Sequence, residues 1–116
     1  MARRIVRGEI VFPDDTPVAR AECVVVRVLD VSLADAPSKI AGQQVMREVP
    51  LPPEDSRLRF EVAAEVDEQA SYTVWAHVDM TGTGEIDVGD LISTQSHPVL
   101  TRGNPDRVNV PVRRIG

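Results

Sequence analysis

The stretch HVDMTGTGEIDVGD, from His77 to Asp90, places oxygen-bearing side chains at the spacing of a calcium-binding loop. An EF-hand loop takes oxygen ligands from positions 1, 3, 5, 7, 9 and 12 and needs a glycine at position 6. With Gly84 at position 6, these ligand positions are held by Asp79, Thr81, Thr83, Glu85, Asp87 and Asp90. Glu85 would offer its backbone carbonyl, and Ile86 would anchor the loop to the core. The spacing therefore predicts a Ca²⁺ site at residues 79–90.

The ligand types predict that such a site binds calcium weakly. Thr81 and Thr83 stand where Asp or Asn is usual, and Asp90 replaces the longer Glu that binds bidentately, which predicts a Kd of about 10⁻⁴–10⁻³ M. The alternative is an ordinary long hairpin, whose glycines take positive φ and whose Asp and Thr side chains bond to nearby backbone. Because short motifs over-predict metal sites, the hairpin is favoured.

Trp75 and His77 form a second candidate site, for a partner protein. Tyr72 and Trp75 point to opposite faces of a predicted strand, so one belongs in the core and the other outside. An exposed Trp75 beside His77 would make a partner-binding patch; otherwise Trp75 fills the interior and Tyr72 lies outside. His77 shares a face with Asp79, which makes a pairing conceivable. No nucleophile motif accompanies His77, and we expect a surface histidine.

A smaller polar cluster lies in LDVSLADAP, where Asp30, Ser32 and Asp35 could form a site. Side chains of this kind more often bond to the backbone of a turn. We therefore expect Ser32 and Asp35 to cap the turn.

Composition limits the partners. The 116 residues carry a net charge of −5 and a pI near 4.9, which argues against nucleic acid and anionic membrane. The single cysteine, Cys23, cannot form an intrachain disulfide, and its apolar surroundings predict a packed thiol. No stretch is long and apolar enough for a transmembrane helix. The N-terminus alternates like a strand and shows no leader, so the chain as written is expected in the cytoplasm.

Apolar residues recur with a period of two, which predicts strands. Leu58, Phe60 and Val62 share one face, as do Val6, Ile10 and Phe12, and Lys39–Val49 is also taken as a strand. Pro98 and Pro111 lie inside apolar runs and predict edge strands or bulges. Turn signals separate about seven strands. Residues 1–116 are therefore expected to form a single all-β domain, an antiparallel β-sandwich of immunoglobulin-like or transthyretin-like type.

Two segments resemble the YbaY/YscW family of small bacterial proteins, which includes envelope lipoproteins and pilotin-type chaperones of type III secretion. They are Val24–Val45, with its LDVSLADAP run, and Ser71–Thr101, with its HVD…GD…TQSHPV run. The resemblance covers about Ile5–Thr101. It implies a small β-sandwich without enzymatic activity, a binding or chaperone role at the envelope, and a fuller acidic loop at Asp79, Asp87 and Asp90. Pilotin-like members are lipidated on a cysteine directly after a leader, whereas Cys23 lies within a predicted strand.

These observations predict a non-enzymatic module that binds a protein or peptide through a sheet edge or an apolar groove around Trp75. The alternative is a calcium-stabilised structural domain, and no other cofactor is expected. Nucleic acid is not expected as a partner, and the chain is expected to be a monomer or a weak oligomer. If a leader has been removed, the family resemblance implies the cell envelope.

Overall fold

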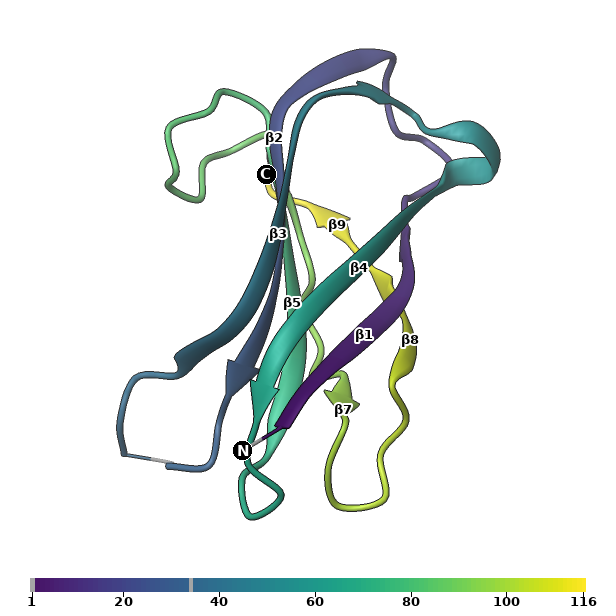
Figure 1. Ribbon diagram of the computed structural model, residues 1–116. Helices are drawn as coiled ribbons and strands as arrows, with labels where there is room; N and C mark the ends of the chain where they lie inside the picture. The colour runs from purple at the N-terminus through teal and green to yellow at the C-terminus, as the bar shows by residue number, and fades with distance from the viewer. Residues whose placement is uncertain (1, 34) are drawn as a thin grey trace.

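The computed structural model describes residues 2–33 and 35–116, and it consists of two β-sheets packed face to face (Figure 1). The small sheet has the strand order β4-β1-β8, and the large sheet has the order β3-β2-β5-β6-β9, with β7 added to β5. The all-β sandwich expected from the sequence is confirmed. Among the described residues, no helix has the length and apolar character needed to cross a membrane.

The elements follow the period-two segments of the sequence. Their bounds are β1 Ala2–Val11, β2 Ala19–Asp30, β3 Lys39–Leu51, the 3₁₀ turn η1 Glu54–Ser56, β4 Arg57–Val66, β5 Tyr72–Asp79, β6 Leu91–Ile92, β7 Pro98–Val99, β8 Arg107–Pro111 and β9 Arg113–Arg114. The described residues form nine strands, against about seven predicted, and three of them, β6, β7 and β9, have only two residues. Pro98 and Pro111 lie in β7 and β8, which are both at sheet margins, as predicted.

Side chains that alternate along the strands fill the space between the sheets. β-Branched residues dominate, because they pack well on a pleated surface; Val24, Val26 and Val28 on β2 are fully buried, and Val74 and Val78 lie beside them on the neighbouring strand β5. Tyr72 lies in this core with 4% of its surface exposed, and its hydroxyl accepts a hydrogen bond from the Asp67 amide at 2.8 Å.

One pairing differs from the predicted antiparallel arrangement, because β1 and β8 run parallel. Arg7 lies opposite Arg107 in this pair, and Val11 lies opposite Pro111. A Cβ atom on Gly8 would lie 1.7 Å from the carbonyl oxygen of Val108, so the close approach of the two strands requires glycine there. After Pro111 the chain crosses to the large sheet as β9, and this crossing closes one side of the sandwich.

On the other side, β3 packs along the outer edge of β4. Gln44 Oε1 accepts a hydrogen bond from the Glu61 amide at 2.8 Å, which satisfies a donor that β1 does not reach. A Cβ on Gly42 would lie 2.1 Å from the Ala63 carbonyl oxygen, so a glycine allows the two backbones to approach. The edge of β4 is therefore covered by part of its own chain.

Candidate partner-binding face and the 80–90 loop

The loop between β5 and β6, residues 80–90, is held to the sheet by two buried carboxylates. Asp79 and Asp90 expose 3% and 0% of their surfaces. The two oxygens of Asp79 accept hydrogen bonds from the Gly82 and Gly84 amides, both at 2.9 Å. Asp90 Oδ1 accepts from the Met80 amide at 2.9 Å. The carboxylates therefore satisfy backbone donors that a long turn would otherwise leave without partners.

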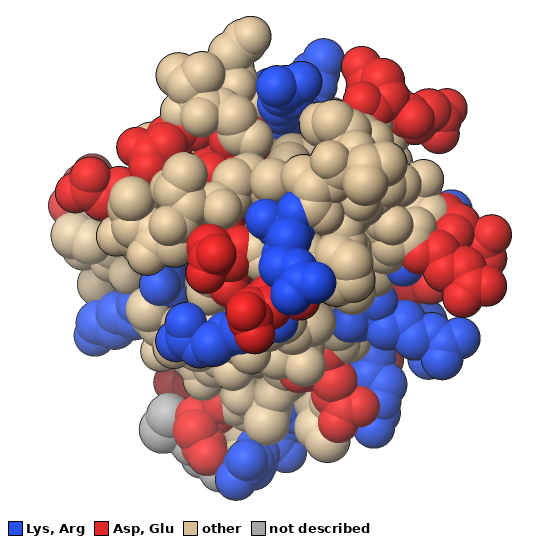
Figure 2. All heavy atoms as spheres, turned by 90° about the horizontal axis from the view of Figure 1, so that it is seen from above, with Lys and Arg blue, Asp and Glu red and all other residues tan. Residues whose placement is uncertain are grey.

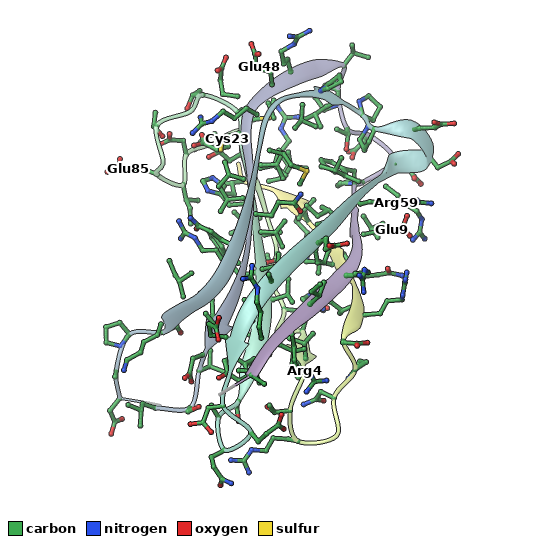
Figure 3. All side chains as sticks on the ribbon, in the orientation of Figure 1. Arg4, Glu9, Cys23, Glu48, Arg59 and Glu85 are labelled. Carbon is green, nitrogen blue, oxygen red and sulfur yellow. The ribbon has the colours of Figure 1, made fainter. Side chains whose placement is uncertain are left out.

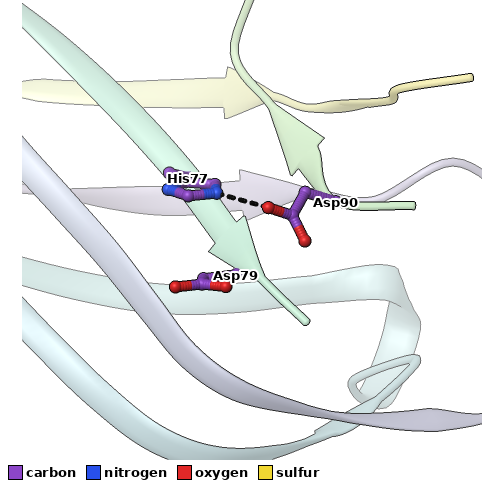
Figure 4. A group of neighbouring side chains, drawn as sticks. All are labelled: His77, Asp79 and Asp90. Carbon is purple, nitrogen blue, oxygen red and sulfur yellow. Dashed lines mark hydrogen bonds and ion pairs between the residues drawn. The ribbon is translucent and has the colours of Figure 1, made fainter. Parts of the chain in front are cut away.

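His77 joins this cluster from β5. Its Nε2 lies 2.8 Å from Asp90 Oδ2, and its other ring nitrogen lies on the side away from Asp90 (Figure 4). Asp90 Oδ2 also accepts a hydrogen bond from the Asp87 amide at 3.1 Å. His77 is 3% exposed, so the prediction of a surface histidine is wrong. The histidine pairs with the carboxylate at the far end of the loop, because the loop folds back over the end of β5.

The hydrogen bonds to Asp90 also determine its protonation. Burial alone raises the pKa of the Asp90 carboxyl, since a charge is costly away from water. Hydrogen bonds from His77, Met80 and Asp87 outweigh that effect, and the pKa lies below its ordinary value. An ionised carboxylate only accepts hydrogen bonds, so Nε2 of His77 carries the proton that lies between the two groups.

Three of these side chains are close enough to be considered as metal ligands. One ligand atom each from His77, Asp79 and Asp90 lies within 4.8 Å of the others. Every carboxylate oxygen of the two aspartates, however, already accepts at least one hydrogen bond from this chain. The calcium site proposed from the spacing stays a prediction, and the loop has the local hydrogen bonds of the alternative hairpin.

The remaining candidate ligands lie at the outer part of the loop. Thr83 donates a hydrogen bond to Asp87 Oδ2 at 2.8 Å, and Thr81 approaches the same oxygen at 3.5 Å. Glu85 is exposed at the tip of the loop (Figure 3). Ile86 is 52% exposed and does not anchor the loop in the core, as the calcium-loop register required. Thus Thr81, Thr83 and Glu85 are exposed, in contrast to the buried cluster of His77, Asp79 and Asp90.

Trp75 lies on the outer face of the large sheet, opposite the buried Tyr72. It is half-buried while Tyr72 lies in the core, so the alternative with Trp75 in the interior and Tyr72 outside is wrong; the partner-binding role of Trp75 and His77 stays a prediction. Cross-strand pairing places Arg27 beside Trp75 and Val25 beside His77. The Arg27 guanidinium carbon lies 5.5 Å from the centre of the Trp75 ring, within cation–π range. Val45, which is 41% exposed, lies opposite Val25 on β3.

A groove of about 670 Å³ crosses this outer face and ends against the 80–90 loop. We call it the Trp75 groove; it is lined by Cys23, Val25, Arg27, Arg47, Trp75 and His77 on the sheet, by Glu22 and Asp79 at its end, and by Thr81, Gly82, Gly84, Glu85 and Ile86 in the loop. Cys23 is only partly buried there, which corrects the prediction of a packed thiol. Its side chain lies on the outer face because the next residue of β2, Val24, points into the core.

The outer face of the small sheet has a different character. Arg7 pairs with Glu61 at 3.1 Å, and Arg57 pairs with Glu9 at 3.3 Å. A hollow of about 530 Å³ on this face is lined mainly by charged residues. Glu9 and Arg59 lie on the side of the molecule opposite Cys23 and Glu85 (Figure 3). This face is therefore a solvated surface of alternating charge, whereas the Trp75 groove carries aromatic and aliphatic side chains.

The LDVSLADAP segment forms a turn support. Asp30 Oδ1 accepts hydrogen bonds from the Ser32 amide at 2.9 Å and the Ser32 hydroxyl at 2.6 Å. These bonds lower the pKa of the Asp30 carboxyl. The Ser32 hydroxyl in turn accepts from the Ser71 amide at 2.9 Å. Turn capping is confirmed, but the carboxylate comes from Asp30, and Asp35 takes no part in these bonds.

Comparisons with known proteins agree with this fold. The family model described as "Type III secretion system lipoprotein chaperone (YscW)" matches residues 1–112. A solved structure, of an alternative pilotin from the type II secretion system of Vibrio cholerae, superposes with a TM-score of 0.72. It shares 22% sequence identity, with 99% of each chain covered, so this likeness establishes the fold alone. A comparison with curated protein sequences finds no match. The chain belongs to the family of YscW-type type III secretion system lipoprotein chaperones.

Proposed function

We propose that this protein is a chaperone that binds a protein component of a bacterial secretion system through the Trp75 groove, and that it acts by binding and not by catalysis. The family supports a protein-binding role. The description of that family as a lipoprotein chaperone of a secretion system supports a partner in the secretion apparatus and a place at the cell envelope.

The observation that carries the assignment to this face is the contrast between the two sheets. Ile86 and the half-buried Trp75 present apolar surface in the groove, and Val45 lies beside it, opposite Val25, whereas the opposite sheet carries two ion pairs. Clustered apolar side chains beside polar ones mark interaction sites in soluble proteins. Seen from above, acidic and basic side chains are interspersed, which is unlike the surface that recognises a polyanion (Figure 2).

The chain contains its own reporter for this proposal, because Trp75 is its only tryptophan. A partner that covers the groove removes water from the indole and shifts its fluorescence to shorter wavelength. The test is a titration of the purified chain with tryptophan-free segments of the outer-membrane channel subunits of secretion systems from the same organism. We expect a saturable shift for at least one segment.

Two variants with matched exposure locate the binding face. Val45 on the large sheet is 41% exposed and Ile5 on the small sheet is 37% exposed. Val45→Asp should weaken binding by about tenfold or more, since it places a charge in a contact that becomes dry. Ile5→Asp should leave the titration unchanged. Equal effects of the two variants, or no saturable shift with any channel segment, would contradict the proposal.

A further inference from the structure

We infer that the Trp75 groove selects an apolar polypeptide segment that carries one or two carboxylates, which pair with Arg27 and Arg47. This inference rests on the proposed function and specifies the chemistry of the partner. It follows from the hydrogen bonds and ion pairs that the two arginines make or lack, and from the side chains around them.

Arg27 is held in position and still has donors to offer. Its Nε donates to Gln43 Oε1 at 3.1 Å, and its guanidinium lies over Trp75. The two terminal nitrogens have no hydrogen-bond acceptor within residues 2–33 and 35–116. A guanidinium that is fixed by stacking loses little conformational entropy when a carboxylate binds to it bidentately.

Arg47 extends this donor set along the groove. It is exposed and lines the groove from β3, where it lies opposite Cys23. In the described part of the chain, neither Arg47 nor Arg27 forms an ion pair, although acidic residues outnumber basic ones by 18 to 13. On the small sheet, Arg7 and Arg57 have glutamate partners, whereas Arg59 and Arg107 form no ion pair with the described residues. What distinguishes the groove is that its two available cations lie beside the apolar side chains of Val25 and Trp75.

The other charges in the groove restrict the ligand further. Glu22 and Glu85 are exposed at its loop end, and they would repel a segment with many acidic residues. Val25, Trp75 and Ile86 lie between the charges, and they favour apolar side chains in the ligand. The complementary ligand therefore has an apolar centre and few carboxylates, and a polyanion does not fit.

The experiment selects ligands without assuming a partner. A phage-displayed library of random 12-residue peptides is selected on the full chain, and enriched peptides are synthesised and titrated by Trp75 fluorescence or, for peptides with tryptophan, by calorimetry. We expect enriched peptides to combine aromatic or aliphatic residues with one or two Asp or Glu. Arg27→Gln and Arg47→Gln should each weaken binding about threefold to tenfold. Arg59→Gln, an exposed arginine of the small sheet, is the control and should change nothing.

A double-mutant cycle identifies the pairing. Replacing the peptide carboxylates by amides should weaken binding to the wild-type chain but not to the Arg27→Gln, Arg47→Gln double variant. If binding depends on Val45 but not on peptide carboxylates or on the two arginines, this inference is wrong and the proposed binding face stands. If no peptide is enriched, or if Val45→Asp and the arginine variants all bind like wild type, both this inference and the proposed binding face are wrong.

Discussion

His77 and Asp90 lie 13 residues apart in the sequence, and their side chains meet at 2.8 Å in a buried position at the base of the 80–90 loop. The pair joins strand β5 to the far end of the loop. Together with Asp79, it fixes the wall at which the Trp75 groove ends. Rigid positioning of this wall is what the loop contributes to a binding face.

Removal of the Asp90 carboxylate should destabilise the whole domain. Asp90→Ala leaves His77 and the Met80 and Asp87 amides without their acceptor, and breaking a buried pair of this kind costs about 3–5 kcal/mol. Urea unfolding followed by circular dichroism measures the change. Glu85→Ala, at the exposed tip of the same loop, is the control. If the free energies of unfolding of Asp90→Ala and Glu85→Ala differ by less than about 0.5 kcal/mol, the cluster is unimportant for stability.

Stability should also depend on pH through Asp90. Its pKa in the folded protein lies below the ordinary value of 3.8, so the folded state holds the charged form more strongly than the unfolded chain does. The resulting stabilisation is complete above that value and is lost as the pH falls through the lower, folded pKa. The free energy of unfolding of the wild type should therefore fall towards that of Asp90→Asn below about pH 4. If the free energies of unfolding of the wild type and Asp90→Asn differ by a constant amount down to pH 2, this prediction is wrong.

Calcium binding can be separated from the hairpin alternative by thermal unfolding in excess EDTA and in millimolar Ca²⁺, with Mg²⁺ as the control. A ligand at about a hundred times its Kd adds about 2.7 kcal/mol, which raises the midpoint by several degrees. Because both oxygens of Asp79 and Asp90 already accept backbone hydrogen bonds, we expect no calcium-specific rise. A rise that is abolished in Asp79→Asn would establish the metal site instead.

Gly8→Ala should disrupt the contact between β1 and β8. The added methyl group would lie 1.7 Å from the Val108 carbonyl oxygen and 2.9 Å from the Phe60 ring, so the strands must separate. Overpacking of this kind costs roughly 1–3 kcal/mol or more. Asn109→Ala, an exposed position on β8, is the matched control. Equal urea midpoints for the two variants would show that the strands can shift without cost.

Cys23 should react with a maleimide in the folded protein, because its thiol is partly buried at the groove and not enclosed in the core. We expect labelling without denaturant, at a rate below that in urea. A peptide bound in the groove should slow it further. Labelling seen only in urea would place the thiol inside the protein.

Much of the fold follows from the alternation of side chains along the strands. This alternation correctly separated Tyr72 from Trp75, and the strand predicted from Lys39 to Val49 corresponds to β3, Lys39–Leu51. It could not identify the neighbour of each strand, since the parallel pairing of β1 with β8 depends on contacts about a hundred residues apart in the register Arg7–Arg107. Pairing is decided by the closing of the whole sandwich.

For the site too, local features were predicted from the sequence, whereas contacts between distant residues were not. The turn chemistry of the loop was predicted from its glycines, and Gly82 and Gly84 take positive φ of 76° and 81°. The burial of His77 was missed, because a histidine in an alternating strand gives no sign that a later loop will cover it. Aspartates at both ends of that loop, Asp79 and Asp90, were the available signal. Read as acceptors for backbone donors, they would have suggested a loop folded over His77.

The parallel pairing of β1 with β8 has a consequence for the timing of folding. β1 is the central strand of the small sheet, and one of its two neighbours is made from residues 107–111, about a hundred residues later in the sequence. Until those residues have left the ribosome, β1 has one edge without a partner, and the sandwich cannot close. The emergence of β8 thus determines when this domain becomes native.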